Sequence, residues 1–216
     1  RKESRNSMNV KAISVNVGKA LLVSALFMLL SIAVSVLNGL DAAFTPLTIS
    51  FIITLLVGAF PFIFIRNTPA MTLTDGYLTI VLSWLLSFIF GMLPYVLYGG
   101  EFTLINAWFE SVSGYTTTGS TILNDIEALP KGLLFWRSST HYIGGLGVVV
   151  FLLLGGIAVR IANGSNAIGT GTAATRRVAV VTKVTTILYA VFHTAILLLT
   201  LLDNETQRFL GGHLTF

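Results

Sequence analysis

The charged residues of this sequence are spaced so that five uncharged stretches, each of 19 or more residues, lie between them. These stretches cover residues 20–40, 42–65, 76–100, 138–159 and 184–202. About 20 mostly apolar residues are enough to cross the hydrocarbon core of a bilayer as one helix. The pattern therefore predicts an all-α integral membrane protein with five spanning helices.

The composition agrees with a chain that is surrounded by lipid. Only 10% of the residues are charged and 54% are apolar, against roughly 25% charged residues in a soluble domain. This composition argues against a water-soluble enzyme, and the absence of cysteine excludes disulfides and thiolate metal sites. The net charge of +4 would suit nucleic acid only if the basic residues formed one patch. We expect membrane lipid, and no nucleic acid, as a partner.

The charges are divided unequally between the two sides of the predicted membrane. One side holds ten Lys or Arg and two acids, and the other holds three Lys or Arg and seven acids. The basic side comprises residues 1–19, the connection around Arg66 and the loop 160–183. By the positive-inside rule the N-terminus is cytoplasmic. The alternative, a secretory signal after Arg5, is less favoured because the apolar run exceeds the 7 to 15 residues typical of such signals.

The segment 102–132 is too polar to span and needs a different explanation. Its first part carries apolar residues at helical spacing, which predicts a short amphipathic helix of about three turns: Leu104, Ile105, Trp108, Phe109 and Val112. A polar run from Gly114 to Thr121 follows. A short helix and an extended polar strand between two spans predict a re-entrant pore loop, because bare backbone at membrane depth is tolerated where it is buried or lines water. The alternative is an ordinary exterior turn.

In a pore loop the polar run would select ions through its backbone. Successive carbonyl oxygens of an extended run can replace the hydration shell of a cation. We expect Gly119 to permit a backbone conformation and a close approach that a Cβ would block. The short helix would point its negative C-terminal end at the ion.

Glu110 lies on the short helix, where an unpaired carboxylate would be costly. Arg137, at the start of the next span, is its candidate partner. A buried pair of this kind would support the pore loop rather than bind the ion. The alternative is that both side chains are hydrated at the membrane interface.

An internal similarity suggests a second copy of the same unit. The third span ends in Gly99-Gly100-Glu101-Phe102-Thr103, and the fifth ends in Gly211-Gly212-His213-Leu214-Thr215. We expect the chain to be part of a longer protein that continues with a second pore loop. The organisation that follows is a cytoplasmic N-terminus at 1–19, two extra spans at 20–72, a first helix, pore loop and helix repeat at 73–159, a cytoplasmic loop at 160–183 and a truncated second repeat at 184–216.

Three segments carry a resemblance to a known family. The segment Asn106–Ser120, with Gly114-Tyr115-Thr116-Thr117-Thr118-Gly119, resembles the first pore loop of the Trk/Ktr/HKT potassium transporter superfamily. The segment Asp125–Ser138 and the run Gly144-Gly145-Leu146-Gly147 are similar to the linker and second helix of the first repeat in its bacterial Trk membrane subunits. Two extra helices before the first repeat are also typical of those subunits.

The resemblance implies a pore of potassium-channel type, built from four unequal repeats of one chain and passing potassium as the transported ion. The filter carbonyls would be those of Thr116, Thr117, Thr118 and Gly119, with Thr117 and Thr118 in direct contact with the ion. In this superfamily a glycine at the Gly119 position goes with potassium selectivity. Glu110 and Arg137 would support the loop.

The resemblance also implies partners and a location. These are a membrane homodimer, a cytoplasmic nucleotide-binding regulatory subunit and the bacterial inner membrane. The sequence departs from the family pattern in the loop 161–175, which is rich in Gly, Ala, Thr and Asn and lacks a longer amphipathic stretch.

Two other functions fit parts of the sequence less well. A secondary cation symporter would use an intramembrane site formed by paired broken helices, whereas we expect one break, in the loop, and none within the spans. An intramembrane hydrolase could use Ser138, Ser139 and His141, but these lack a third, orienting group. We expect no enzyme activity.

We interpret Gly144, Gly145 and Gly147 as helix-packing positions and His141 and His193 as hydrogen-bonded packing residues.

Overall fold

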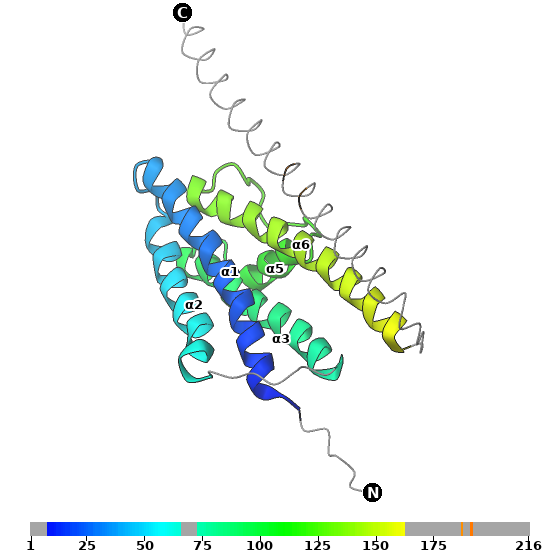
Figure 1. Ribbon diagram of the computed structural model, residues 1–216. Coiled ribbons are helices and arrows are strands. Elements are labelled where there is room, and N and C mark those ends of the chain that lie inside the picture. The colour runs from blue at the N-terminus through cyan, green and yellow to red at the C-terminus, as the bar shows by residue number, and fades with distance from the viewer. Residues whose placement is uncertain (1–7, 66–72, 163–186, 188–190, 192–216) are drawn as a thin grey trace, which may run out of the picture. The chain divides into compact units, whose positions relative to one another are not determined.

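The computed structural model describes residues 8–65 and 73–162, together with Ile187 and Val191. The chain divides into two compact units, residues 1–145 and 146–216, and the site described below lies in the first. The helices are α1 (Val10–Leu37), α2 (Phe44–Phe64), α3 (Leu73–Gly91), α4 (Leu93–Tyr98), α5 (Leu104–Tyr115) and α6 (Lys131–Ala162) (Figure 1). The described residues include no strand, and the predicted all-α class is confirmed.

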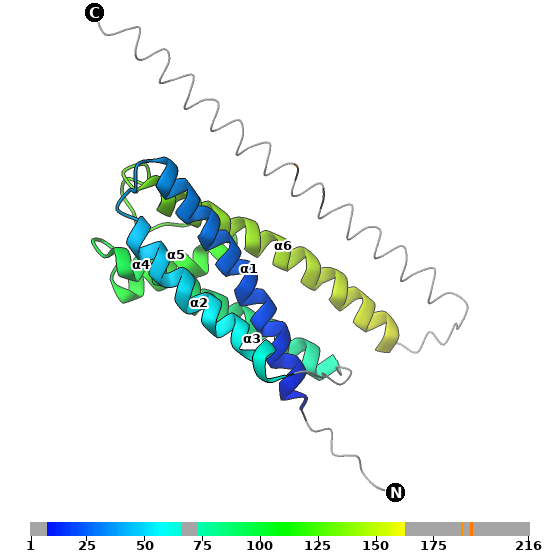
Figure 2. The same ribbon diagram turned by 60° about the vertical axis from the view of Figure 1, so that its left-hand side comes forward.

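Among the described residues, three segments are long and apolar enough to cross a membrane: α1, α2 and Thr74–Tyr98, which comprises nearly all of α3 together with α4. α1 packs against both α2 and α3 (Figure 2). α1 and α2 approach closely, because a Cβ on Gly18 would lie 2.6 Å from the carbonyl oxygen of Gly58. Small residues allow this close packing between membrane helices.

The outer surface of α2 is almost entirely apolar. Its exposed side chains include Ile49, Ile52, Leu56, Phe60, Ile63 and Phe64. A continuous exposed apolar surface of this kind is unfavourable in water and is the surface that lipid chains accept. The protein is therefore a multi-pass membrane protein.

Helix α1 begins ten residues before the uncharged stretch that marks the first predicted span. Asn9 caps it, since its side-chain oxygen accepts the backbone N–H of Ala12 at 3.1 Å. Two lysines are thereby included in the helix, and both are exposed: Lys11 and Lys19. Residues that end a span in the sequence need not end a helix, because a helix continues into the headgroup region.

The expectation that the spans themselves are unbroken is wrong for the third. α3 ends at Gly91 and α4 begins at Leu93, with Pro94 at its start. Proline has no N–H to donate to the preceding turn, so it kinks a helix. The Tyr95 N–H bonds to the Met92 carbonyl at 3.1 Å, and the Gly91 carbonyl accepts the indole N–H of Trp136 at 3.1 Å instead.

The fourth predicted span lies within α6. The fifth, at 184–202, lies outside the described residues apart from Ile187 and Val191, as do His193, residues 163–183 of the cytoplasmic loop and residues 203–216 of the second repeat. The boundaries of the predicted segments stay predictions.

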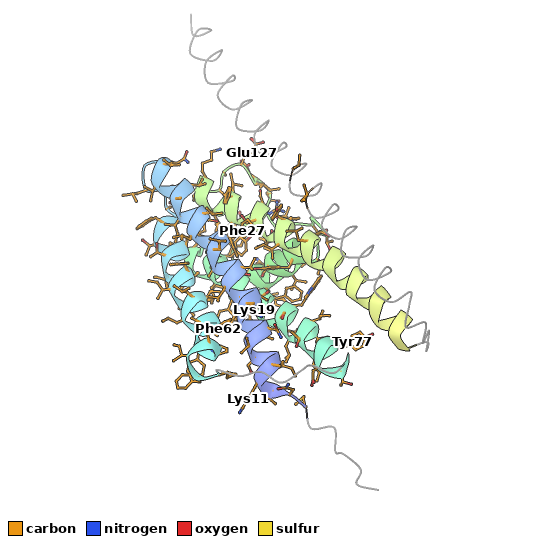
Figure 3. All side chains as sticks on the ribbon, viewed as in Figure 1. Lys11, Lys19, Phe27, Phe62, Tyr77 and Glu127 are labelled. Carbon is orange, nitrogen blue, oxygen red and sulfur yellow. The ribbon has the colours of Figure 1, made fainter. Side chains whose placement is uncertain are left out.

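The buried core lies near the turn that joins α1 to α2. It contains Met28, Ala43, Leu47, Tyr95, Phe102, Ala107, Leu129, Leu133 and Trp136. Asp41 fastens this end, because its carboxylate accepts the N–H groups of Ala43 at 3.1 Å and Gly132 at 2.9 Å, and the hydroxyl of Ser35. The two extra helices are thus tied to the first turn of α6. Figure 3 shows Lys11 and Glu127 at opposite ends of this unit.

Candidate cation pore loop

Helix α5 places the polar run that follows it. Thr103 caps the helix by accepting the N–H of Asn106 at 3.3 Å. Four of the five apolar residues that predicted the helix are exposed, and Val112 is half-buried; the exposed ones are Leu104, Ile105, Trp108 and Phe109. The buried face is mostly polar and small, with Ala107, Glu110, Ser111, Ser113, Gly114 and Tyr115. The helix therefore turns its hydrogen-bonding groups into the protein.

The last turns of α5 are anchored to α1 and α3. The hydroxyls of Tyr115 and Ser24 lie 2.9 Å apart, and the Ser111 hydroxyl donates to the Phe88 carbonyl at 2.8 Å. Gly91 leaves room for the Tyr115 ring, since a Cβ there would lie 2.5 Å from it. These contacts hold the end of α5 against α1 and α3.

Helix α6 packs against the last turn of α5 at two glycines, Gly114 and Gly144. A Cβ on Gly114 would lie 2.1 Å from the Thr140 hydroxyl, and a Cβ on Gly144 would lie 1.9 Å from the Tyr115 carbonyl oxygen. Contacts that short are impossible, so both positions require glycine unless the backbone shifts. The packing interpretation of Gly144 is confirmed.

The end of α5 is a Schellman turn. Thr116 donates its N–H to Val112 at 2.9 Å, Thr117 to Gly114 at 2.9 Å and Thr118 to Ser113 at 3.0 Å. The N–H of Gly119 also points to the Ser113 carbonyl, at 3.5 Å. The 5→2 and 6→1 bonds from Thr117 and Thr118 define this motif. The N–H groups of the polar run are therefore directed back at the helix.

The direction of the carbonyl groups follows from these bonds. A trans peptide is planar and its C=O points opposite to the N–H of the next residue. The N–H groups of Thr117, Thr118 and Gly119 face the helix, so the carbonyls of residues 116, 117 and 118 point away from it. None of these three carbonyls accepts a hydrogen bond from the part of the chain that the structure describes. Their peptide dipoles continue that of α5, which makes the loop face favourable for a cation.

The polar run is not the extended strand that the sequence predicted. Thr116 is helical, with φ −80°, and Thr117 has φ +58°. Positive φ is rare for a β-branched residue, and it is required here because Thr117 takes the place in the Schellman turn where glycine is usual. Residues 117–120 are exposed.

Gly119 shows one of the two properties expected of it. Its φ is +78°, a conformation that glycine adopts without strain. The expected close approach is absent from the described residues, because a Cβ on Gly119 would meet nothing within 4 Å. Glycine is needed here for its dihedral angle.

Glu110 and Arg137 form an ion pair beneath the loop. The Nε of Arg137 donates to Oε2 of Glu110 at 3.1 Å, and the side chains are 15% and 1% exposed. The other carboxylate oxygen accepts the N–H of Ile122 at 2.8 Å and the hydroxyl of Thr121. Glu110 therefore joins α5 to α6 and to the segment that leaves the loop. Sequence reasoning missed Thr121 and Ile122.

Two residues of the hydrolase hypothesis, Ser139 and His141, form hydrogen bonds with backbone carbonyls of α6, the helix to which they belong. The Ser139 hydroxyl donates to the Phe135 carbonyl at 2.7 Å, and Nδ1 of His141 lies 2.9 Å from the Arg137 carbonyl oxygen. A carbonyl oxygen only accepts, so Nδ1 carries the proton in this bond. This arrangement suits packing and gives no support to an activated nucleophile.

A family model described as TrkH, cation transport protein, matches residues 42–207. Among curated proteins, the Trk system potassium uptake protein TrkH of Halomonas elongata is 33% identical over 145 residues, covering 66% of this chain and 30% of that protein. The Trk system potassium uptake protein TrkG of Escherichia coli K12 is 43% identical over 77 residues, covering 35% of this chain and 16% of that protein.

The crystal structure of the potassium transporter TrkH from Vibrio parahaemolyticus has a similar fold. The TM-score is 0.68 and the sequence identity 29%, with 85% of this chain and 37% of that chain covered. The chain thus spans between about a sixth and two fifths of the length of these three proteins.

Proposed function

This chain belongs to the TrkH family of cation transport proteins, and we propose that the full-length protein takes up potassium through a pore whose filter includes the carbonyls of Thr116, Thr117, Thr118 and Gly119. Potassium is the transported substrate. The family transports cations rather than catalysing a covalent reaction, and relatives named as potassium uptake proteins support the choice of ion.

The observation that carries the proposal is the direction of the backbone after α5. Three carbonyls, those of residues 116–118, point away from the helix because the following N–H groups bond back to it. Carbonyl oxygens held in a row are the ligands that replace the hydration shell of potassium. The contacts of Tyr115 with Ser24 of α1 and with Gly144 of α6 supply the rigidity that such a row needs.

Three finer statements belong to the same proposal. The protein lies in the bacterial inner membrane with its N-terminus in the cytoplasm, supported by the excess of Lys and Arg on one side. It forms a membrane homodimer. It binds a cytoplasmic nucleotide-binding regulatory subunit, for which the basic stretch 160–183 is the candidate contact.

A secondary cation symporter is the alternative, and the kink at Met92 is the feature that could have favoured it. A symporter site uses backbone groups that a broken helix leaves open to the ion. Here the Gly91 carbonyl accepts the Trp136 indole N–H at 3.1 Å. The open carbonyls lie in the loop after α5, and this favours the pore.

The proposal is tested by growth of an uptake-deficient bacterium that expresses the complete gene. We expect the parent to restore growth at low potassium, and Gly119→Ser and Thr118→Ala to raise the potassium requirement. A serine at φ +78° is strained by about 1 kcal/mol, and the backbone relaxes by turning the Thr118 carbonyl.

Gly39→Ser is the matched control for Gly119→Ser. Gly39 also has positive φ, +84°, and a Cβ there would also meet nothing within 4 Å, but it lies in the turn between α1 and α2. We expect it to grow like the parent. Equal growth of all four strains at low potassium would contradict the filter assignment, and failure of the parent would contradict the function.

A further inference from the structure

Ser113, in the last turn of α5, contacts the polar run at two points. Its backbone carbonyl accepts the N–H of Thr118 at 3.0 Å and that of Gly119 at 3.5 Å. Its side-chain hydroxyl donates to the carbonyl oxygen of Ser120 at 2.6 Å. Ser113 is 5% exposed, so its hydroxyl lies inside the protein while its bonding partners in the polar run are exposed.

The two contacts orient the peptide groups in opposite senses. Bonds from the N–H groups of Thr118 and Gly119 to Ser113 turn the carbonyls of residues 117 and 118 outward. The bond from the Ser113 hydroxyl turns the Ser120 carbonyl inward. Ser113 therefore bonds to the run on both sides of Gly119: its backbone leaves the carbonyls of residues 117 and 118 open, and its side chain occupies that of Ser120.

Little besides this hydroxyl holds the Ser120 carbonyl in place. Ser120 is exposed and follows Gly119, whose backbone is the least restricted of any residue type. Without the hydrogen bond, the Ser120 peptide is free to rotate. Its oxygen could then point away from α5, as the carbonyl oxygens of residues 116–118 do. The number of coordinating carbonyls is one of the properties that sets the preference of a filter between ions.

We propose that Ser113 is a positioning residue for ion selectivity, whose hydroxyl withdraws the Ser120 carbonyl and so limits the open row to the residues before it. The inference rests on the proposed function, because it assigns a role within that pore loop. Ser113 does not touch the ion and acts through Ser120.

Ser111 provides a matched control on the same helix. Its hydroxyl is buried and donates to a backbone carbonyl, that of Phe88, at 2.8 Å. The carbonyl belongs to α3 rather than to the polar run. Ser111→Ala therefore removes an equivalent hydrogen bond without releasing a loop carbonyl.

The test is the ratio of potassium to sodium uptake by the full-length protein in vesicles, measured for each variant at equal ion concentrations. A ratio within one variant does not depend on how much protein is inserted. We expect Ser113→Ala to lower the ratio about fivefold, the equivalent of one net hydrogen bond of about 1 kcal/mol. We expect Ser111→Ala to lower the protein yield and leave the ratio unchanged.

Two further variants keep the test decisive if Ser113→Ala does not fold. Ser113→Thr keeps the hydroxyl and should keep the parent ratio, whereas Ser113→Cys keeps the size with a weaker donor and should give a lower ratio. A parent ratio for Ser113→Cys, or for Ser113→Ala where that variant folds, would overturn the inference while leaving the proposed function intact. A parent protein without potassium uptake would refute the proposed function, and the inference with it.

Discussion

Replacing Glu110 by glutamine removes one bond of the carboxylate and keeps the others. Oε1 accepts the Ile122 N–H and the Thr121 hydroxyl, and an amide oxygen can still accept both. Oε2 accepts from Nε of Arg137 at 3.1 Å, and the amide NH₂ that replaces it is a donor. In Glu110→Gln the amide NH₂ therefore faces the Nε–H of Arg137, and both groups are donors. The guanidinium also loses its counter-charge.

The expected cost follows from the burial of the pair. Breaking a buried ion pair by removing one partner costs about 3 to 5 kcal/mol. Arg137 is 15% exposed and can recover some hydration, so we expect a loss of about 3 kcal/mol for Glu110→Gln. Arg137→Gln should cost at least as much, because the carboxylate that it leaves unpaired is 1% exposed.

The double substitution separates a pair interaction from two independent defects. Two amides can donate and accept between these positions, so we expect Glu110→Gln with Arg137→Gln to cost about 3 kcal/mol, no more than either single change. The assay is the melting temperature of the full-length protein in detergent, followed by loss of the monodisperse peak. Additive shifts in melting temperature, or a parent-like Glu110→Gln, would refute the reasoning.

Three other changes test the loop, its contact with α6 and the turn between α1 and α2. Thr117→Gly should stabilise the protein by about 1 kcal/mol, because it relieves positive φ at a β-branched residue, and a lower melting temperature would contradict this. Gly144→Ala should destabilise by about 3 kcal/mol, because its Cβ would lie 1.9 Å from the Tyr115 carbonyl oxygen; an unchanged melting temperature would be inconsistent with that contact. Asp41→Asn should cost about 1 to 2 kcal/mol in the same melting assay, because an amide nitrogen cannot accept the Gly132 N–H, and equal stability would show that this bond is dispensable.

Two of these changes have matched controls in the chain. A Cβ on Gly76, in α3, would meet nothing within 4 Å, so Gly76→Ala should leave the melting temperature unchanged or slightly raised. Asp125 accepts the N–H groups of Glu127 at 3.0 Å and Ala128 at 3.3 Å with one oxygen. Asp125→Asn keeps that oxygen and should have little effect.

The features predicted correctly from sequence are those that depend on residue type alone. The length of the uncharged stretches predicts the membrane helices. A buried carboxylate needs a counter-charge, and this predicts the pairing of Glu110 with Arg137, 27 residues further along. Gly144 was identified as a packing position because small residues permit close helix contacts.

The features that sequence reasoning missed depend on the backbone. The bond from Ile122 to Glu110 uses an N–H that every residue except proline has, so no pattern of side chains indicates it. The positive φ of Thr117 contradicts the local preference of threonine and is imposed by the N–H groups that bond back to α5. The kink after Gly91 is different, because a residue type does indicate it: Pro94 lies within an apolar stretch.

The central claim is that the carbonyls after α5 bind the transported ion. The most direct measurement is an experimental structure of the full-length protein in rubidium, a heavier potassium substitute located by its anomalous scattering. We expect an anomalous peak within coordination distance of the Thr117 and Thr118 carbonyl oxygens. Rubidium bound at another membrane site, with none at these carbonyls, would contradict the account.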